Sequence, residues 1–307
     1  MTFRIENIVF ELGEKQITAA EISDLLGIDY QRLIEKSGFE CLYITEKQDI
    51  KFYQNFLNKY LLLVDGDIVI FVNQTFDSDI PGSVPIIFEN TPNTQRAFFI
   101  EISDGCTGFL RALTVADSLL TTMNGRVHIV CAEKYSNFIS DDNRSSKPIF
   151  SDAISLVTLI AGKEYEILDN RIVNQFQEFN TIAISKTEKS EFEMQGAKVL
   201  KWASVAVTGQ IQELLEANSI EIADVSGLYL HQGSRIVVET ITKSIRYLAR
   251  NSFQSGEIGN TVASSIPVLL SLNSANSGEF MQEGINILSA FGIGLSSISM
   301  LIKKIPE

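Results

Sequence analysis

The sequence predicts an α/β protein in which two halves repeat one order of strands and helices. Short runs rich in β-branched and aromatic residues alternate with segments of helical period, a pattern typical of a layered α/β core. With 307 residues, the chain is long enough for one large core or two smaller ones. We therefore expect two related domains, residues 1–162 and 163–307.

In the first half, three segments are typical of strands, because each is apolar and is followed by polar or turn residues: 60–75, 97–103 and 126–136. A helix is expected directly after Cys106, where apolar residues recur at helical spacing while Arg111 and Asp117 fall elsewhere on the wheel. Its expected buried face comprises Phe109, Leu113, Ala116, Leu120 and Met123.

The second half begins with an amphipathic segment at residues 199–218. Its expected apolar side consists of Trp202, Val205, Ile211 and Leu215. An acidic connector and a strand follow and lead to His231. The apolar stretch 285–302 contains Asn286, several serines and two glycines, so it predicts two buried strands around a turn and not a membrane span.

A weak duplication links the two halves when the order of segments is compared. Residues 67–75, 101–120, 126–136 and 152–160 correspond in order to residues 227–233, 256–275, 285–297 and 297–304. In such a repeat, the ends of corresponding strands meet. We therefore expect Cys106, His231 and Asn260, which are far apart in the sequence, to share one central site.

Charge and cysteine content exclude several functions. The formal net charge of -13 opposes attraction to nucleic acid or to an anionic membrane, so neither partner is expected. The first residues contain no basic region leading into an apolar one, which favours a cytoplasmic protein. Cys41, Cys106 and Cys131 lack metal-ligand spacing, and with only two histidines no metal site is expected.

Cys106 has two interpretations. At a helix N-terminus, unpaired backbone N–H groups and the helix dipole favour the thiolate and can lower a thiol pKa from about 8.5 toward roughly 3.5–7.5. The neighbouring Gly105 and Gly108 allow close approach by a reacting carbonyl. The alternative is a small buried packing residue, which is the interpretation given to Cys41 and Cys131.

His231 and Asn260 are similarly ambiguous when taken singly. His231 lies where a strand ends and a helix begins, a junction that faces a crevice in α/β proteins, but it also fits a structural hydrogen bond. Asn260 follows a glycine and precedes a helix start, so it fits a turn or N-cap as well as a functional site. His128, inside an alternating strand pattern, is interpreted as a strand residue.

Taken together, four segments carry a resemblance. The segments GCTGFLRAL (105–113), LHQGS (230–234), GNTVASSIP (259–267) and FGIGLSS (291–297), in this order, resemble the ketoacyl-acyl-carrier-protein synthase III group of the thiolase-like superfamily. The likeness extends from about residue 29 to the C-terminus. It implies an α/β, thiolase-like, duplicated αβαβα layered fold with mixed central sheets, and usually a homodimer.

The resemblance also implies a chemistry. Cys106 would take an acyl group from acyl-CoA or an acyl carrier protein (ACP), and His231 and Asn260 would hydrogen-bond the carbonyl of a malonyl thioester as carbon dioxide leaves. The backbone N–H groups of Cys106 and Ile293 would form the oxyanion hole. No metal and no permanently bound cofactor is implied. Relatives that condense without decarboxylation use a glutamate base; Ile80 stands at the corresponding position here, and Glu89 lies nearby in the sequence.

Departures from the family pattern bear on the substrate. Arg32 aligns with a tryptophan that stacks on coenzyme A, and Lys36 aligns with an arginine, while HQGS and SDAIS also differ from the usual motifs. These changes favour a specialised fatty-acid, polyketide or secondary-metabolite pathway. On a helix expected after His231, the basic residues form one stripe, which is either a solvated face or a carrier or CoA contact: Arg235, Lys243, Arg246 and Arg250.

Two alternatives stay open beside a decarboxylative condensing enzyme. One is an acyltransferase that moves the acyl group from Cys106 to an alcohol, an amine or a carrier. The other is a catalytically silent subunit in a heterodimer with a related synthase. In either enzyme, the residues expected to bound an acyl tunnel are Phe109, Phe138, Phe150 and residues 80–92.

Overall fold

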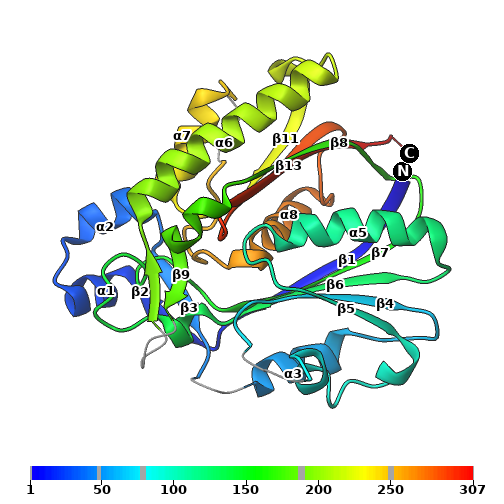
Figure 1. The fold of residues 1–307 in the computed structure, drawn as a ribbon, viewed down its shortest axis with the longest axis horizontal. Coiled ribbons are helices and arrows are strands. Elements are labelled where there is room, and N and C mark those ends of the chain that lie inside the picture. The colour runs from blue at the N-terminus through cyan, green and yellow to red at the C-terminus, as the bar shows by residue number, and fades with distance from the viewer. Residues whose placement is uncertain (1, 47–49, 77–80, 186–190, 248–251, 307) are drawn as a thin grey trace.

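A computed structural model of the chain describes residues 2–46, 50–76, 81–185, 191–247 and 252–306 (Figure 1). The strands of its main sheet are β1 (Thr2–Leu12), β4 (Ile68–Val72), β5 (Phe98–Ile102), β6 (Val127–Glu133), β7 (Ala153–Ala161), β8 (Tyr165–Asn174), β11 (Val225–Leu230), β12 (Gly284–Gly292) and β13 (Ser296–Lys304). The larger helices are α3 (Lys51–Tyr60), α5 (Gly108–Thr122), α6 (Gly196–Ala217), α7 (Arg235–Ser244) and α8 (Ser265–Ser277).

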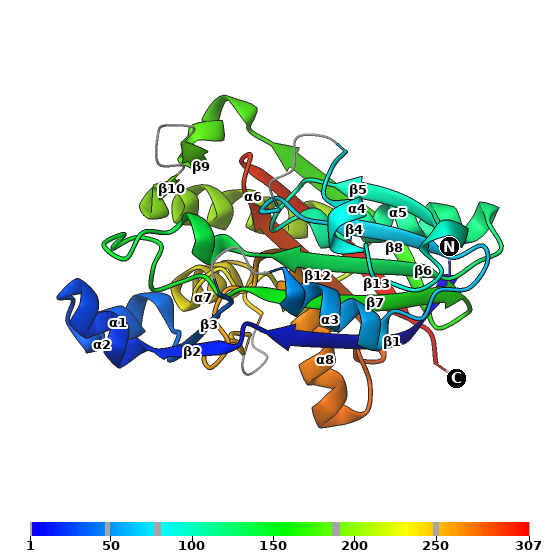
Figure 2. The ribbon, with the colours of Figure 1, turned by 90° about the horizontal axis from the view of Figure 1, so that it is seen from below.

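Smaller elements flank this framework. Strands β2 (Lys15–Thr18) and β3 (Cys41–Ile44) form an antiparallel pair. Helices α1 (Ala19–Leu26) and α2 (Tyr30–Ser37) lie between them in the chain, and the four elements project at one end of the molecule (Figure 2). Strands β9 (Ile182–Ser185) and β10 (Glu191–Met194) form a second antiparallel pair. Helix α4 (Val84–Ile87) is a single turn. The two chain termini lie together at the opposite end from α1 and α2.

The nine strands form one mixed sheet in the order β11-β12-β13-β8-β1-β7-β6-β4-β5. Strand β4 is parallel to both β5 and β6, and β11 is parallel to β12, whereas the remaining pairs are antiparallel. The expectation of an α/β fold with a mixed sheet is therefore confirmed. The short β1–β8 pairing joins two limbs that were expected as separate sheets.

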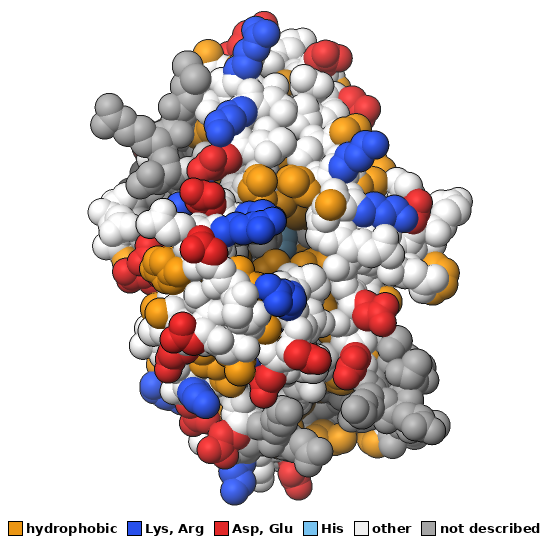
Figure 3. Space-filling model, turned by 90° about the vertical axis from the view of Figure 1, so that its left-hand side faces the viewer, with side chains coloured by type: hydrophobic (Ala, Val, Ile, Leu, Met, Phe, Trp, Pro, Cys, Tyr) orange, Lys and Arg blue, Asp and Glu red, His pale blue; other side chains and the backbone are white. Residues whose placement is uncertain are grey.

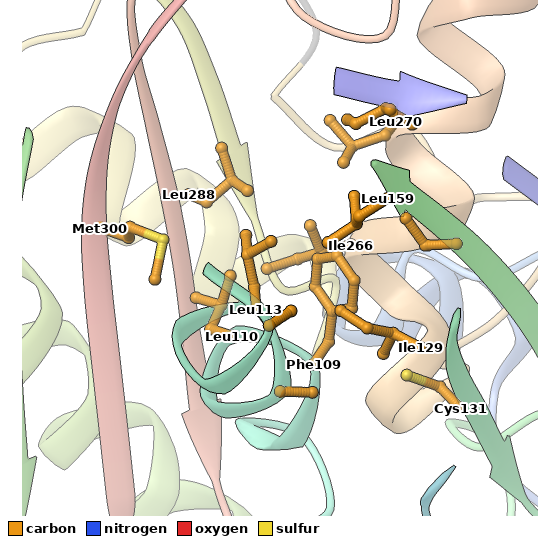
Figure 4. Close-up of a cluster of buried hydrophobic side chains, with 14 of the residues drawn as sticks. Phe109, Leu110, Leu113, Ile129, Cys131, Leu159, Ile266, Leu270, Leu288 and Met300 are labelled. Atoms are coloured by element: carbon orange, nitrogen blue, oxygen red, sulfur yellow. The ribbon is translucent and has the colours of Figure 1, made fainter. Parts of the chain in front are cut away.

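The limbs curve around two buried helices. Helices α5 and α8 lie between the strands of the first and second limbs, α3 covers the outer face of one limb, and α6 and α7 cover the outer face of the other (Figure 1). Figure 4 shows α5, through Phe109 and Leu113, meeting Ile266 of α8 in the central core. Burial of these apolar faces on both sides of each limb yields five layers, helix, sheet, helix, sheet, helix.

The limbs have the same internal order. Strands β1, β7, β6 and β4 lie side by side as β8, β13, β12 and β11 do, with the parallel pair in the same place in each. Strand β5 has no counterpart in the described part of the second limb. Because the limbs share a sheet and the α5–α8 core, the division at residues 162 and 163 stays a prediction.

Most elements lie where the sequence places them, and the differences have simple causes. Residues 285–302 form the antiparallel strands β12 and β13, as expected. On α6, Val205 is 71% exposed because the buried face follows Ala203 and Val207, each about half a turn from it. Met123 lies just past the end of α5 and is also exposed. Among the described residues, no helix is long and apolar enough to cross a membrane.

Candidate active site

A narrow cavity of about 80 Å³ lies at the ends of β6, β11 and β12. Cys106, His231 and Asn260 all line it, together with Phe291, Gly292 and Ile293. Figure 3 shows the corresponding face, where a hollow contains hydrophobic side chains and a histidine and is flanked by Lys and Arg side chains. The fold thus brings together three residues that are separated by 125 and 29 positions in the chain, taking 231 − 106 and 260 − 231.

Cys106 lies in the turn between β5 and α5, one residue before the helix N-cap Thr107. It packs so closely against Gly292 that a Cβ at that position would lie 2.7 Å from the Cys106 sulfur. Gly292 is therefore the residue that lets the FGIG turn approach the thiol. The backbone N–H groups of Cys106 itself and of Ile293 hydrogen-bond toward the sulfur.

The thiol pKa differs from the expectation of a lowered value. Burial raises it above its ordinary value, and the carboxylates of Glu133 and Asp104 act in the same direction, while the N–H groups of Cys106 and Ile293 oppose the rise. The prediction of an activated resting thiolate is wrong, because desolvation outweighs the helix N-terminus. Cys106 is a neutral thiol in the resting site.

His231 follows β11 and is almost completely buried. Its backbone N–H donates to the Ser289 carbonyl at 2.8 Å, and its ring meets that of Phe291 edge to face at 5.2 Å. Burial lowers the pKa of His231 to about 3, so the ring is neutral near pH 7. Its Nδ1 has no hydrogen-bond partner in the described part of the chain.

Hydrogen bonds fix the backbone of Asn260 through both its N–H group and its carbonyl. Its backbone N–H donates to the Ile149 carbonyl and its own carbonyl accepts from Ser151 N–H, each at 2.9 Å. The side-chain Oδ1 accepts from the N–H of Val262 at 2.9 Å, which leaves the amide NH₂ as the group available to a ligand. Val262 has a φ of 53°, a strained conformation for a β-branched residue that is typical of functional sites.

Comparison with known families accounts for this arrangement. The family model for 3-oxoacyl-[acyl-carrier-protein (ACP)] synthase III matches residues 100–175, and its C-terminal model matches residues 215–304. The first contains Cys106, and the second contains His231, Asn260 and Ile293. The β-ketoacyl-[acyl-carrier-protein] synthase III of Streptococcus agalactiae is 26% identical over 94% of this chain and 85% of its own length. The synthase III of a Wolbachia species from Brugia malayi is 24% identical over 95% of this chain and 96% of its own length.

The chain is a synthase III-like condensing enzyme of the thiolase-like superfamily.

Solved structures show the same fold. The 3-oxoacyl-(acyl carrier protein) synthase III of Pseudomonas aeruginosa PAO1 superposes with a TM-score of 0.87 at 20% identity, over the full length of both chains. The priming β-ketosynthase of the R1128 polyketide pathway has a TM-score of 0.83 at 18% identity, covering 99% of this chain and 97% of its own. OleA of Xanthomonas campestris has a TM-score of 0.82 at 12% identity, covering 99% of this chain and 98% of its own. The synthase III-like enzyme therefore has a thiolase-like fold.

The cavity of the synthase III-like enzyme has a lining that sequence reasoning found only in part. Of the expected tunnel residues, Phe150 lines it, whereas Phe109 packs into the central core and Phe138 only packs beside the cavity. Residues 81–92 do not line it, Glu89 is exposed, and Ile80 lies outside the described residues. The lining residues that sequence reasoning missed come from the segment after β6, the β9–β10 pair and α6: Tyr135, Ile182, Phe192, Met194 and Val199.

The site also contains a buried carboxyl group, that of Glu133, which the sequence did not predict. Glu133 ends β6 and is fully buried. Its Oε2 accepts from the backbone N–H of Gln74 at 3.1 Å and from the Thr75 hydroxyl at 2.9 Å. Burial raises the pKa of Glu133 to about 8 against the opposing effect of these two hydrogen bonds. A single acidic residue at the end of a strand pattern gives no sequence signal of such an environment.

The basic residues proposed to bind a carrier or coenzyme A are arranged differently from the expected stripe. Helix α7 ends at Ser244, and Arg246 follows it with a left-handed φ of 58°, so Arg246 does not continue a helical face. Arg235 lies over the Phe253 ring at 5.4 Å, and Lys243 is paired with Glu239 at 3.2 Å. Arg250 lies outside the described residues.

The remaining two residues proposed to bind a carrier or coenzyme A lie on helix α2. Arg32 and Lys36 are both exposed there, and Gly38, which ends α2, is so close to α7 that a Cβ on it would lie 2.5 Å from the Arg235 Cβ. Helices α2 and α7 therefore lie next to each other. In the part of the chain that the structure describes, no group of three or more His, Cys, Asp or Glu residues is arranged to hold a metal ion.

Proposed function

We propose that the chain transfers an acyl group from a thioester to Cys106 and then condenses it with a malonyl thioester. In the first step, the Cys106 sulfur attacks the thioester carbonyl, the carbon–sulfur bond to the donor breaks, and the donor leaves as a free thiol. In the second, the malonyl unit loses carbon dioxide, and the resulting carbanion attacks the acyl-Cys106 carbonyl. The product is a 3-oxoacyl thioester, and Cys106 is regenerated.

Site chemistry supports these roles. The N–H groups of Cys106 and Ile293 both hydrogen-bond toward the sulfur, which supports a role for them in binding the oxyanion of the acyl-transfer intermediate. A neutral His231 ring and the NH₂ of Asn260 supply uncharged donors for the thioester enolate that forms on decarboxylation. The observation that carries the proposal is the meeting of all five groups at one buried cavity.

The acylation step is tested by intact mass measurement. The wild-type protein and Cys106→Ala are incubated with a panel of acyl thioesters on coenzyme A and on a carrier protein. An acyl mass on the wild type alone supports Cys106 as the nucleophile and identifies the donor. Absence of an adduct with every donor contradicts the proposal and favours the silent partner subunit.

Carbon dioxide release distinguishes condensation from simple acyl transfer. When a malonyl thioester is added to the acylated protein, the proposal expects stoichiometric carbon dioxide and a 3-oxoacyl product. Transfer of the acyl group to an alcohol or amine without carbon dioxide contradicts condensation.

The pathway and the partners belong to the same proposal. Exposed Arg32 and Lys36 beside α7 support contact with a phosphate-bearing donor, either CoA or an acyl carrier protein, in a specialised fatty-acid, polyketide or secondary-metabolite pathway. Strand β5 is one of the two edge strands of the main sheet and exposes Phe98. An apolar sheet edge of this kind supports a homodimer. A cytoplasmic location stays a prediction.

A further inference from the structure

The turn that precedes Cys106 packs against two side chains from other segments of the chain. A Cβ on Gly105 would lie 2.5 Å from the Gln74 Oε1 and 3.2 Å from the Tyr135 hydroxyl, so only glycine lets the three groups meet. The Tyr135 hydroxyl donates to Gln74 Oε1 at 3.1 Å. Gln74 and Tyr135 therefore form the surface against which the Cys106 turn lies.

The carboxyl group of Glu133 connects Gln74 to the end of β6. Its Oε2 accepts from the backbone N–H of Gln74 at 3.1 Å and from the Thr75 hydroxyl at 2.9 Å. The Thr75 oxygen in turn accepts from the backbone N–H of Lys134 at 2.7 Å. Because Oε2 takes two donors, the proton of a neutral Glu133 belongs on Oε1, which has no hydrogen-bond partner among the described residues.

Two carboxyl groups act on the Cys106 thiol, and they differ in their partners. Asp104 forms an ion pair with Arg111, whereas no cation among the described residues acts on the Glu133 carboxyl. The ionisable groups that interact with Glu133 are all acidic: Asp152, Tyr53, Tyr135, Cys106 and Cys131. Burial raises the pKa of Glu133 to about 8, so the carboxyl is mostly neutral near pH 7.

We propose that Glu133 is a positioning residue for the acylation of Cys106 and that its carboxyl group serves in the protonated form. In that form it holds Gln74 behind the Cys106 turn and adds no negative charge near the sulfur. Ionised Glu133 still accepts from Gln74 and Thr75, but it repels the negative charge that develops at Cys106. The acylation itself rests on the proposed function, whereas the effect of the charge on the thiol depends only on this cluster.

Two reactions of Cys106 test the inference in the wild type, Glu133→Gln and Glu133→Ala between pH 6.5 and pH 9.5. One is single-turnover acylation by the best donor of the acyl-thioester panel. The other is alkylation by iodoacetamide, in which the thiolate sulfur bonds to carbon and iodide leaves, so no enzymatic step is needed. Peptide mass spectrometry separates the cysteines: Cys41 is the reference for reagent reactivity, and alkylation of buried Cys131 reports unfolding. Exposed Glu89→Gln is the matched control.

In the wild type, alkylation of Cys106 should accelerate about tenfold per pH unit up to pH 8 and level off above it, because ionisation of Glu133 opposes that of the thiol. Glu133→Gln should match the wild type at pH 6.5 and exceed it by about threefold or more at pH 9.5. Glu133→Ala removes the acceptor for Gln74 and Thr75. It should lower the maximal acylation rate about tenfold at every pH, with little change in the donor concentration needed for half-maximal rate.

The pH profile distinguishes the charge of Glu133 from a purely structural role. Coincident profiles of the wild type and Glu133→Gln overturn the inference, as does a difference between them that is the same at every pH. An unchanged acylation rate in folded Glu133→Ala overturns the positioning role. A wild-type alkylation profile that levels off, without acylation by any donor, retains the charge effect and rejects the proposed function. Glu133→Gln keeps an oxygen acceptor for both donors, so it decides the question even where Glu133→Ala does not fold.

Discussion

The two polar residues that face Cys106 differ in how they are held, yet both present a neutral donor to the same cavity. His231 is kept uncharged by burial, and Asn260 is oriented by the hydrogen bond between its Oδ1 and Val262 N–H. In the proposed mechanism, neither residue takes part in forming the bond between Cys106 and the acyl group. Loss of either residue should therefore affect the second half-reaction more than the first.

We expect His231→Ala and Asn260→Ala each to slow decarboxylative condensation by about 10²–10³-fold, because one donor to the developing oxyanion is lost. The acyl-Cys106 adduct should persist in both variants. Intact mass and carbon dioxide release measure the two steps separately. Asn124→Ala, an exposed change in the turn after α5, should leave both steps unchanged. Loss of the adduct in folded Asn260→Ala would contradict this division of roles.

Glu133 predicts a pH dependence of stability. Its pKa is about 8 in the folded protein and near the ordinary value of 4.5 when unfolded, so the folded state binds the additional proton between these values. The contribution is complete below pH 4.5 and is lost as the pH rises through 8. Glu133→Gln should abolish this part of the loss, whereas exposed Glu89→Gln should not. Urea unfolding at pH 5.5 and pH 8.5 measures the change in the free energy of unfolding. An equal decrease in Glu133→Gln and in the wild type would contradict the prediction.

At the scale of elements, one cluster links the start of α5 to β13. Arg111 forms an ion pair with Asp104 and donates to the Ser296 hydroxyl at 2.8 Å, while the Thr107 and Ser296 hydroxyls lie 3.3 Å apart. Asp104 and Thr107 flank Cys106, and Ser296 lies three residues beyond Ile293. The two N–H groups that face the sulfur come from different limbs of the fold. This cluster connects the segments that carry them.

We expect Arg111→Ala to lower the maximal rate of Cys106 acylation by about tenfold, with little change in the donor concentration needed for half-maximal rate, because the effect is on N–H geometry and not on donor binding. Arg111→Lys should recover part of the rate through its ion pair with Asp104. Single-turnover acylation, followed by mass spectrometry at several donor concentrations, gives the maximal rate and the donor concentration at half-maximal rate. A change confined to the half-maximal concentration would assign Arg111 to donor binding instead.

The exposed cations around α7 predict a carrier-dependent effect. Lys243→Glu with Arg246→Glu should raise KM for an acyl carrier protein substrate by about tenfold, but not for a small thioester, because the reversed charges repel an acidic carrier. Lys163→Glu, in the exposed turn between β7 and β8, is a single charge-reversal control. Steady-state kinetics with both donors gives the comparison, and equal changes for both donors would exclude this surface as the docking site.

At the scale of the whole molecule, strand β5 leaves the nine-stranded sheet open at one edge. Phe98 there is 55% exposed, and the residues that follow it along the strand are partly buried at best. A second copy of the chain can pair with this edge through a two-fold axis and so continue the sheet. The other edge strand of the sheet is β11.

Phe98→Asp should therefore convert a dimer into a monomer, because a charge on the edge strand opposes pairing. Light scattering with size-exclusion chromatography measures the mass. Val205→Asp is the matched control, since Val205 is 71% exposed on α6, which covers the second limb, whereas β5 is an edge strand of the first limb. A dimeric Phe98→Asp protein would place the interface elsewhere.

The sequence alone determined the order of the main elements and the residues proposed to carry the chemistry. Apolar runs located β5, β6, β12 and β13, and helical periodicity located α5, because strands and helices differ in the spacing and length of their apolar segments. The resemblance of four short segments to the synthase III group pointed to Cys106, His231, Asn260 and the FGIG turn. These are local features, and neighbouring residues suffice to specify them.

Only the tertiary structure decided how those residues behave. The pKa of Cys106 rises where a helix N-terminus alone would lower it, because desolvation depends on everything packed around the sulfur. The rings of Tyr135, Phe150 and Phe192 pack together beside the cavity although they come from three separate segments of the chain. The exposure of Val205 likewise follows from which face of α6 packs against the rest of the fold. Burial and long-range contact are properties of the whole fold, so no local stretch of the chain encodes them.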